Sequence, residues 1–234
     1  MIKRKILKKL YATRLLRLAK RSTRYRDLES MLGIDATLLA RYVTGTVMPG
    51  TSQARRIIEG LGGARMLADI LRRSIEEHGG YIDLAPLLSD VDYLCALALD
   101  LSIRYERESI DTVLVPETSG ISLATLIASN LDARLVIARR RKENPLHSYY
   151  EEHLVRPPNI RRSFYVRQGL LVEGSNVLIV DDIIHSGLTL ELMLRIARKA
   201  NTRVAGIASV VAVGDRWREI LEGVRVEYFL YYPG

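Results

Sequence analysis

Two adjacent carboxylates and a small polar turn occur together in residues 176–190, NVLIVDDIIHSGLTL. Residues 177–180 form an unbroken apolar run, which is typical of a strand buried on both faces of a parallel sheet. The run ends in Asp181-Asp182, and the turn His185-Ser186-Gly187 comes before an apolar-periodic segment that begins near Thr189. We therefore predict a strand, a turn and the start of a helix, in that order.

This order of elements suits an anion that lies beside a diol. Backbone N–H groups at a helix N-terminus point at an anion, and the helix dipole favours negative charge. Ser186 and Thr189 add hydroxyl donors, and Gly187 lets the backbone come close. Carboxylates repel a phosphate, so Asp181 and Asp182 need another role, and accepting hydrogen bonds from sugar hydroxyls is one. A ribose 5-phosphate satisfies both requirements.

The same stretch resembles the phosphoribosyl-pyrophosphate motif of the type I phosphoribosyltransferases. The resemblance implies that Asp181 and Asp182 hold the ribose hydroxyls. It also implies that one turn wraps the 5-phosphate, formed by His185, Ser186, Gly187, Leu188 and Thr189. Two positions depart from the family pattern, because His185 stands where the family often has Asp, Thr or Ala, and Leu188 where it usually has Gly or Lys. Any Mg²⁺ is expected to arrive on bound phosphoribosyl pyrophosphate, and we predict no separate metal site.

Two more stretches follow predicted strands. Glu117, Thr118, Ser119 and Gly120 come after a strand at 112–115 and before a helix, which makes a second cradle for an anion. This loop resembles the pyrophosphate loop of xanthine and purine-type phosphoribosyltransferases and of the purine repressor. Arg139 and Arg140 open a run of four cations after a strand at 135–138, and guanidinium forks match phosphate oxygens. A surface turn and a solvated charge run are the alternatives.

From Tyr81 onward the pattern alternates between helix and strand, which predicts a parallel α/β sheet with ligands at the carboxyl ends of its strands. The resemblance implies the type I phosphoribosyltransferase fold for residues 80–234. Residues 143–162 are polar and long for a loop, and we expect a mobile lid there. Tyr81 and the tyrosines near the C-terminus are candidates for stacking on a base.

Composition separates the first quarter from the rest. The net charge is +8, yet residues 1–60 alone hold fourteen Lys or Arg against four Asp or Glu. This asymmetry indicates an anionic polymer as partner of the N-terminal part. The single cysteine excludes a disulfide framework, and no apolar run approaches a membrane span. We expect a soluble cytoplasmic protein with no membrane partner.

The N-terminal part is predicted to be an all-α domain, residues 1–79. A basic helix at 2–20 precedes two short helices joined by a Gly-containing turn within residues 25–50, and their spacing resembles the helix-turn-helix of Cro and phage repressors. The resemblance implies a DNA-binding face made of Arg24, Arg26, Ala36, Thr37, Arg41 and Thr44. The alternatives are a helical bundle with a solvated basic face, and a membrane-surface or RNA-binding helix.

The two halves together favour a DNA-binding transcriptional regulator. In this interpretation the protein is a homodimer on double-stranded DNA, and its second domain senses phosphoribosyl pyrophosphate or a purine nucleotide. His185 replaces a carboxylate that contacts the base in the 6-oxopurine enzymes, whereas Leu188 keeps its backbone N–H. Binding is therefore expected to survive better than catalysis, and we expect a sensor with no activity or weak activity. The alternative is a working purine phosphoribosyltransferase that uses the same pocket.

Overall fold

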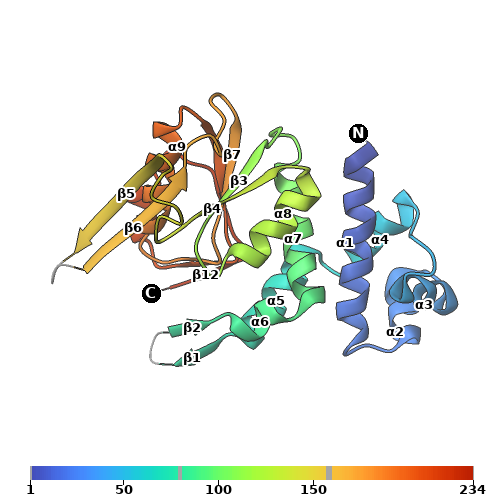
Figure 1. The fold of residues 1–234 in the computed structure, drawn as a ribbon. Coiled ribbons are helices and arrows are strands. Elements are labelled where there is room, and N and C mark those ends of the chain that lie inside the picture. Colours follow the sequence, from blue (N-terminus) through green and yellow to red (C-terminus); the bar gives the residue numbers. More distant parts are fainter. Residues whose placement is uncertain (1, 79–80, 157–159, 234) are drawn as a thin grey trace. The chain divides into compact units, whose positions relative to one another are not determined.

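The computed structural model describes residues 2–78, 81–156 and 160–233. Contacts divide the chain into two compact units, Met1–Arg104 and Tyr105–Gly234 (Figure 1). The boundary predicted at Gly79-Gly80 lies outside the described residues. The first unit extends beyond that point because the following elements pack on the preceding helices; for example, the Tyr93 hydroxyl donates to the Leu67 carbonyl at 2.5 Å.

The N-terminal unit is mainly helical. Its elements are α1 (Ile2–Lys20), α2 (Tyr25–Leu32), α3 (Ala36–Thr44), α4 (Thr51–Gly60), α5 (Ala64–Ser74), the short strands β1 (Glu76–His78) and β2 (Tyr81–Asp83), α6 (Ala85–Ser89) and α7 (Val91–Tyr105). The domain predicted to be all-α to residue 79 departs from that pattern after Ser74, where α5 ends and β1 pairs antiparallel with β2.

The helices α2 and α3 begin and end at the residues that the sequence indicates. Gly33 follows α2 in the left-handed region at φ 60°, where a residue with a Cβ is strained. The Asp35 carboxylate then caps α3 by accepting hydrogen bonds from the N–H groups of Thr37 at 2.9 Å and Leu38 at 3.1 Å. Gly45, at φ 79°, ends α3 in the same way.

Helix α1 is more buried than a surface helix with one basic face would be. It packs against both α3 and α4. Side chains around much of its circumference are buried: Leu7, Tyr11, Ala12, Leu15, Leu16, Leu18 and Ala19. Two apolar side chains of the helix, Ile6 and Leu10, are 48% and 38% exposed. The helix is therefore a central element of its unit.

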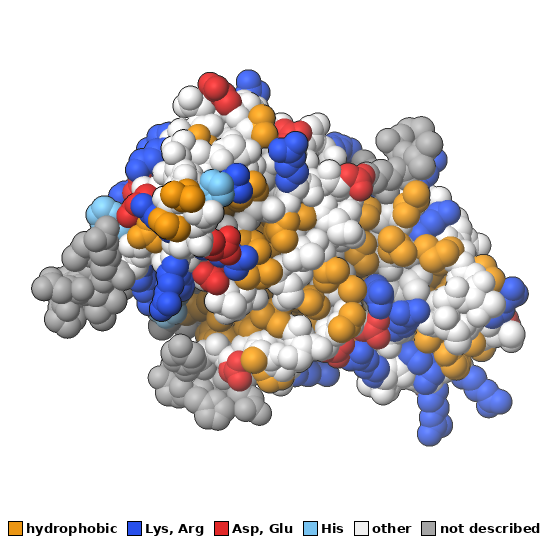
Figure 2. Space-filling view, viewed as in Figure 1, with side chains coloured by type: hydrophobic (Ala, Val, Ile, Leu, Met, Phe, Trp, Pro, Cys, Tyr) orange, Lys and Arg blue, Asp and Glu red, His pale blue; other side chains and the backbone are white. Residues whose placement is uncertain are grey.

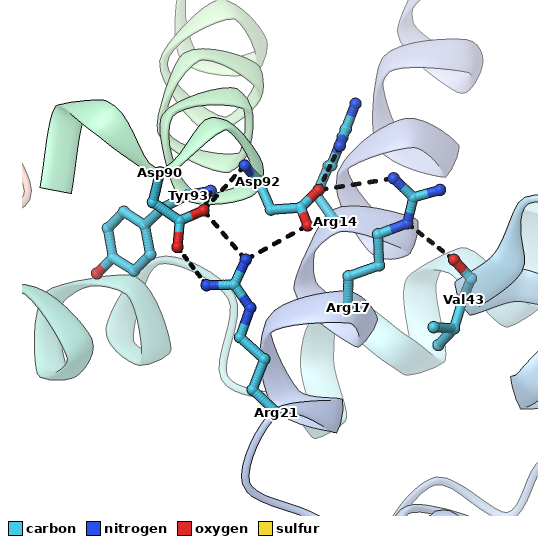
Figure 3. Close-up of polar contacts among 7 residues, drawn as sticks. All are labelled: Arg14, Arg17, Arg21, Val43, Asp90, Asp92 and Tyr93. Carbon is cyan, nitrogen blue, oxygen red and sulfur yellow. Dashed lines mark hydrogen bonds and ion pairs between the residues drawn. The ribbon is translucent and has the colours of Figure 1, made fainter.

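Two arginines of α1 and Arg21, which follows it, are engaged inside the unit by carboxylates at and just before the start of α7 (Figure 3). Arg14 and Arg21 form ion pairs with Asp92 and Asp90, respectively. A nitrogen of Arg17 lies 3.6 Å from Asp92, and a second nitrogen of Arg21 lies 3.4 Å from the same residue. These ion pairs tie the C-terminal half of α1 and Arg21 to the start of α7.

The C-terminal unit is the predicted α/β fold. Its elements after α7 are β3 (Thr112–Pro116), α8 (Ile121–Leu131), β4 (Arg134–Ala138), β5 (Tyr149–Arg156), β6 (Ile160–Arg167), β7 (Asn176–Val180), β8 (Ile183–Ile184), α9 (Leu188–Lys199), β9 (Arg203–Ala208), β10 (Val211–Val213), α10 (Arg216–Ile220), β11 (Val226–Glu227) and β12 (Leu230–Tyr232).

The main sheet has five parallel strands in the order β11-β9-β7-β3-β4. The chain moves outward from β3 to β4 and then crosses back to β7 on the other side of β3, so the order reverses between β3 and β7. Ligands of open α/β sheets bind at the carboxyl ends of the strands at such a switch point. The prediction of a parallel α/β sheet is confirmed.

Residues 149–167 differ from the prediction. We expected a lid-like loop to about residue 162. Instead, β5 and β6, which have eight residues each, pair as an antiparallel hairpin (Figure 1). Polar side chains hide the strand pattern because they have partners outside the hairpin: Lys199 of α9 lies 2.7 Å from Glu152 of β5. The backbone groups of Arg139 and Tyr165 also bond to each other, which attaches β6 to the end of β4.

Candidate active site

Asp181 and Asp182 follow β7 directly, at the switch point of the sheet. The N–H of Asp181 donates to the Ala208 carbonyl at 3.1 Å, and the carbonyl of Asp182 accepts from the Ser209 hydroxyl at 2.9 Å. These bonds to the end of β9 fix the backbone of the acidic pair. The two side chains are half-buried, and the Asp181 carboxylate also accepts the N–H of Asp182 at 3.0 Å.

The two carboxyl groups are electrostatically linked. Burial raises the pKa of Asp181 well above its ordinary value, and repulsion by Asp182 and a hydrogen bond between the two side chains add to the shift. The Arg140 guanidinium opposes this shift in pKa. Hydroxyl donors or a cation would relieve this repulsion, which suits a ligand that brings both.

The loop 117–120 lies against the acidic pair. A Cβ built on Gly120 would be 3.1 Å from the Cα of Asp181 and 3.3 Å from the N of Asp182, so the two backbones are in close contact there. Thr118 and Ser119 are exposed, and the peptide bond between Glu117 and Thr118 is cis. The structure thus brings the two predicted anion cradles together at the ends of β3 and β7.

Glu117 anchors this loop to the end of β4. Its carboxylate accepts the backbone N–H of Arg140 at 2.9 Å and lies 3.5 Å from the Arg139 guanidinium. Arg139 also pairs with Glu143 at 3.1 Å, so its charge is shared between two carboxylates. The Arg140 guanidinium instead lies over the Phe164 ring, 5.2 Å from its centroid, and its charge favours a lower pKa for Asp181.

The turn before α9 forms the third part of the site. Gly187 occupies the N-cap position at φ 78°, and the N–H groups of the first turn of α9 follow it. A cavity of about 180 Å³ is present at this turn, and the described residues that line it are Arg162, Asp181, Ile183, Ile184, His185, Ser186, Gly187, Thr189 and Leu190. The other predicted ligand-binding residues, all within the described chain, do not line this cavity: Asp182, Leu188, Glu117, Thr118, Ser119, Gly120, Arg139 and Arg140.

A larger cavity of about 690 Å³ adjoins the first. The strands β8, β10 and β12 form a parallel three-stranded sheet, so their carboxyl ends meet at one edge. The described residues lining the cavity lie at those ends or on β6: Arg162, His185, Ser186, Val213, Gly214, Asp215, Arg216, Tyr231 and Pro233. We refer to it as the C-terminal cavity.

Sequence reasoning missed Arg162 and the residues 213–216. Residues 213–216 could have been found from the sequence, because an apolar run followed by Gly214-Asp215-Arg216 resembles the apolar run that precedes Asp181. Arg162 has no such signal, since it lies inside a polar strand that we predicted as loop. Tyr231, one of the predicted stacking tyrosines, does line the C-terminal cavity.

The residues predicted to contact DNA lie in the N-terminal unit. Five of them are exposed and Ala36 is half-buried: Arg24 and Arg26 lie at the start of α2, Thr37 opens α3 with Ala36, and Arg41 and Thr44 lie in its last turn. Exposure alone does not distinguish a DNA-binding face from an ordinary solvated surface.

No group of three or more His, Cys, Asp or Glu side chains among the described residues could hold a metal ion unaided. None of the described helices is long and apolar enough to cross a lipid bilayer.

The C-terminal unit is an open parallel α/β sheet with two turns and an acidic pair at its switch point. The chain belongs to the phosphoribosyl transferase domain family, whose model matches residues 96–227. The fold is that of the type I phosphoribosyltransferases. The match leaves the helices α1 to α6 outside it.

Three relatives illustrate the similarity. The chain is 32% identical over 141 residues to xanthine phosphoribosyltransferase of Lactobacillus acidophilus, covering 56% of this chain and 73% of that protein. It is 27% identical over 158 residues to adenine phosphoribosyltransferase of Thermotoga neapolitana, covering 64% and 88%. The structure of adenine phosphoribosyltransferase from Rhodothermus marinus superposes with a TM-score of 0.64 at 24% identity, covering 71% of this chain and 98% of that one.

These similarities correct the predicted function. The prediction of a DNA-binding transcriptional regulator with a non-catalytic sensor domain is wrong, because the relatives and structural neighbours are purine phosphoribosyltransferases. That prediction relied on the excess charge of residues 1–60. Arg14, Arg17 and Arg21 account for part of that excess, and they are engaged by carboxylates of their own unit.

Proposed function

We propose that the protein is a purine phosphoribosyltransferase. It joins a purine base to the ribose 5-phosphate of phosphoribosyl pyrophosphate and releases pyrophosphate. The observation that supports this most directly is the close approach of Gly120 to the backbone of Asp181, because it brings the loop 117–120 next to the acidic pair. The named activities of the relatives are of the same kind.

Each part of the ligand has a matching group in this site. The N–H groups at the start of α9 receive the 5-phosphate, and the hydroxyls of Ser186 and Thr189 add donors. Asp181 and Asp182 accept hydrogen bonds from the ribose hydroxyls. The backbone of 117–120 and the Arg140 guanidinium receive the diphosphate, which leaves as the bond from C1 to its oxygen breaks and the base nitrogen bonds to C1.

The carboxylates available in the site indicate how Mg²⁺ would bind. Two carboxylates of the acidic pair are too few for a resident metal site, and the described residues offer no larger cluster. They do fit a Mg²⁺ ion that arrives with phosphate oxygens and water as its other ligands. When bound in this way, Mg²⁺ supplies positive charge to the diphosphate leaving group.

The test is direct. The full chain is incubated with phosphoribosyl pyrophosphate, Mg²⁺ and adenine, guanine, hypoxanthine or xanthine in turn, and the nucleotide and pyrophosphate are quantified. We expect nucleotide from at least one base, and none from the Asp181→Asn, Asp182→Asn double variant. Absence of nucleotide with all four bases from the folded parent protein would contradict the proposal.

Two further assignments accompany this one. We propose that α2, its turn and α3 have the fold of a helix-turn-helix. The Asp35 cap and the buried Leu28 and Leu39 support this assignment, and nuclear Overhauser contacts between those two leucines test it.

We also propose a homodimer, as is common in the family. A monomer by light scattering at micromolar concentration would contradict that assignment.

A further inference from the structure

The small cavity at the turn before α9 is the part of the site that we assign to the 5-phosphate. A phosphate ester carries a charge of about −1.5 to −2 at neutral pH. The turn itself offers neutral N–H and hydroxyl donors and the partial charge of a helix N-terminus, about +0.5. Asp181 also lines the cavity, and its carboxylate repels a phosphate when it is ionised. A cation in the same cavity would therefore add much to the affinity for a phosphate dianion.

One arginine supplies such a charge. Among the described residues that line this cavity, Arg162 is the only Lys or Arg. It comes from β6 and not from the turn, and its side chain is exposed. No carboxylate of the described chain forms an ion pair with it. Its N–H donors are therefore available to a ligand, and a guanidinium fork matches the geometry of phosphate oxygens.

The alternation of β6 explains why Arg162 faces the site. Successive side chains of a strand point to opposite faces, so Arg162, Phe164 and Val166 share one face. Phe164 and Val166 are fully buried in the hydrophobic core of the C-terminal unit. Arg162 is the next side chain on this inward face, at the point where the strand leaves the core and borders the phosphate turn. Arg167 belongs to the opposite face of the same strand and is exposed.

The hairpin that carries Arg162 is fastened to the helix that begins at the phosphate turn. The Glu152 carboxylate of β5 lies 2.7 Å from Lys199 and 3.9 Å from Arg195, both on α9. Only 13% of the Glu152 side chain is exposed, so these ion pairs are shielded from solvent. Leu154, the next residue on the same face of β5, is the cross-strand partner of Arg162. The arginine is therefore held near the turn by a contact with α9 itself.

We propose that Arg162 is a specificity-determining residue of the ligand site, and that its guanidinium pairs with the phosphate of a sugar 5-phosphate. The inference rests on the proposed function, which assigns that phosphate to the turn before α9. The pairing selects a sugar that carries a phosphate ester over the same sugar without one. The diphosphate has separate groups in the loop 117–120 and Arg140, so Arg162 acts on the sugar phosphate and not on the leaving group.

The experiment compares three ligands. Calorimetry on the full chain measures the affinities of ribose 5-phosphate, ribose and inorganic pyrophosphate. We expect Arg162→Gln to bind ribose 5-phosphate at least about tenfold more weakly than the parent, because charge-assisted hydrogen bonds to the phosphate are lost. Its affinities for ribose and pyrophosphate should stay as in the parent. Arg162→Lys should recover part of the lost affinity, since it restores the charge without the planar fork.

Arg167→Gln is the matched control, because it removes the same charge from the opposite face of the same strand. It should leave the affinity for ribose 5-phosphate unchanged. The inference is overturned if the parent does not bind ribose 5-phosphate, if Arg162→Gln binds it as the parent does, or if Arg167→Gln loses as much affinity. A loss confined to pyrophosphate overturns it as well.

The nucleotide assay separates this inference from the proposed enzyme. Binding of ribose 5-phosphate that depends on Arg162, without nucleotide from any base, supports the phosphate role of Arg162 and contradicts the enzyme. Nucleotide formation by a parent whose affinity for ribose 5-phosphate does not depend on Arg162 supports the enzyme and contradicts the role of Arg162.

Discussion

The Cα of Asp181 lies only 3.1 Å from the position that a Cβ on Gly120 would occupy. Real Cβ atoms rarely come this close to backbone, so the loop 117–120 reaches the acidic pair only because residue 120 lacks a side chain. The relationship joins the two halves of the proposed ligand site, since one side receives the diphosphate and the other the ribose.

Gly120→Ala tests this relationship. The added methyl group must push the loop away from Asp181, so we expect a loss of affinity for phosphoribosyl pyrophosphate, with a smaller effect on thermal stability. Calorimetric titration measures the affinity. Gly50→Ala is the control, because its Cβ would meet only the end of the flexible Gln53 side chain, at 2.5 Å. Unchanged affinity in Gly120→Ala would show that the loop has room to move.

Removing the charge of the acidic pair should raise the stability of the protein and weaken its binding of ligand. Because the pKa of Asp181 is raised in the folded protein, its ionisation costs folding free energy, and stability falls as pH rises through that raised pKa. Asp181→Asn removes the charge, so the unliganded variant should have a higher Tm than the parent at neutral pH. The difference should disappear below the ordinary carboxyl pKa of 3.8. Scanning calorimetry across this pH range measures the difference in Tm between variant and parent. Each kcal/mol of stability should shift Tm by about 2–4 °C.

Ligand binding should change in the other direction. Replacing both residues, Asp181→Asn with Asp182→Asn, removes charge-assisted hydrogen bonds to the ribose hydroxyls, each worth about 1.5–3 kcal/mol. We expect weaker binding of phosphoribosyl pyrophosphate, measured by calorimetry. Inorganic pyrophosphate, which has no ribose, is the control ligand and should not lose affinity. Equal affinity of the parent and the double variant for phosphoribosyl pyrophosphate would remove the sugar-binding role.

Much of the fold follows from local sequence signals. The apolar run 177–180 predicts β7 because a strand with both faces buried has no polar position. Asp35 and Gly33 predict the boundaries of α3 and α2 because capping depends on residues only a few positions apart. The acidic pair and the phosphate turn are contiguous as well, which is why that part of the site could be predicted.

The rest depends on partners that are distant in sequence. Arg14 and Asp92 are 78 positions apart, so a run of basic residues cannot reveal that its cations are engaged. The hairpin β5–β6 presents Glu152 to Lys199 of α9, and this polar contact conceals strand alternation. The C-terminal cavity is built from β8, β10 and β12, which have only two or three residues each. Strands of that length carry no readable periodicity.

Asp90 should contribute most of the stability in the cluster of Figure 3. Its carboxylate caps α7 by accepting the N–H groups of Asp92 at 3.1 Å and Tyr93 at 3.2 Å, and it pairs with Arg21. Asp90→Ala loses both functions and should cost about 1–3 kcal/mol, whereas Arg21→Ala should cost about 1 kcal/mol or less. Chemical denaturation measures both, and Asp69→Ala, in an exposed pair with Arg72, is the control.

The pH dependence of this cluster has the opposite sign to that of Asp181. The hydrogen bond from Arg21 lowers the pKa of Asp90, with help from the N–H groups of α7. Its stabilisation is therefore present above the ordinary carboxyl pKa and is lost as pH falls through the lowered value. A difference between parent and Asp90→Ala that grows on acidification below pH 3.8 would contradict this assignment.

Gly187 provides the sharpest test of the phosphate turn. It has φ 78°, and an added Cβ would lie 3.0 Å from the Cα of Trp217, whose indole is held by its bond to Gly214. Gly187→Ala should therefore carry both the strain of a left-handed residue, about 1–3 kcal/mol, and a collision with backbone that cannot move away. The start of α9 should shift, and ribose 5-phosphate should bind more weakly in calorimetry.

Gly223→Ala separates the two contributions, because Gly223 has φ 75° and nothing within 4 Å of its Cβ position. It should show the backbone strain alone and keep its affinity for ribose 5-phosphate. Denaturation of the two variants side by side then gives the cost of the Trp217 contact as their difference. If Gly187→Ala costs no more stability than Gly223→Ala and binds ribose 5-phosphate as the parent does, the turn before α9 is not the rigid phosphate site that we describe.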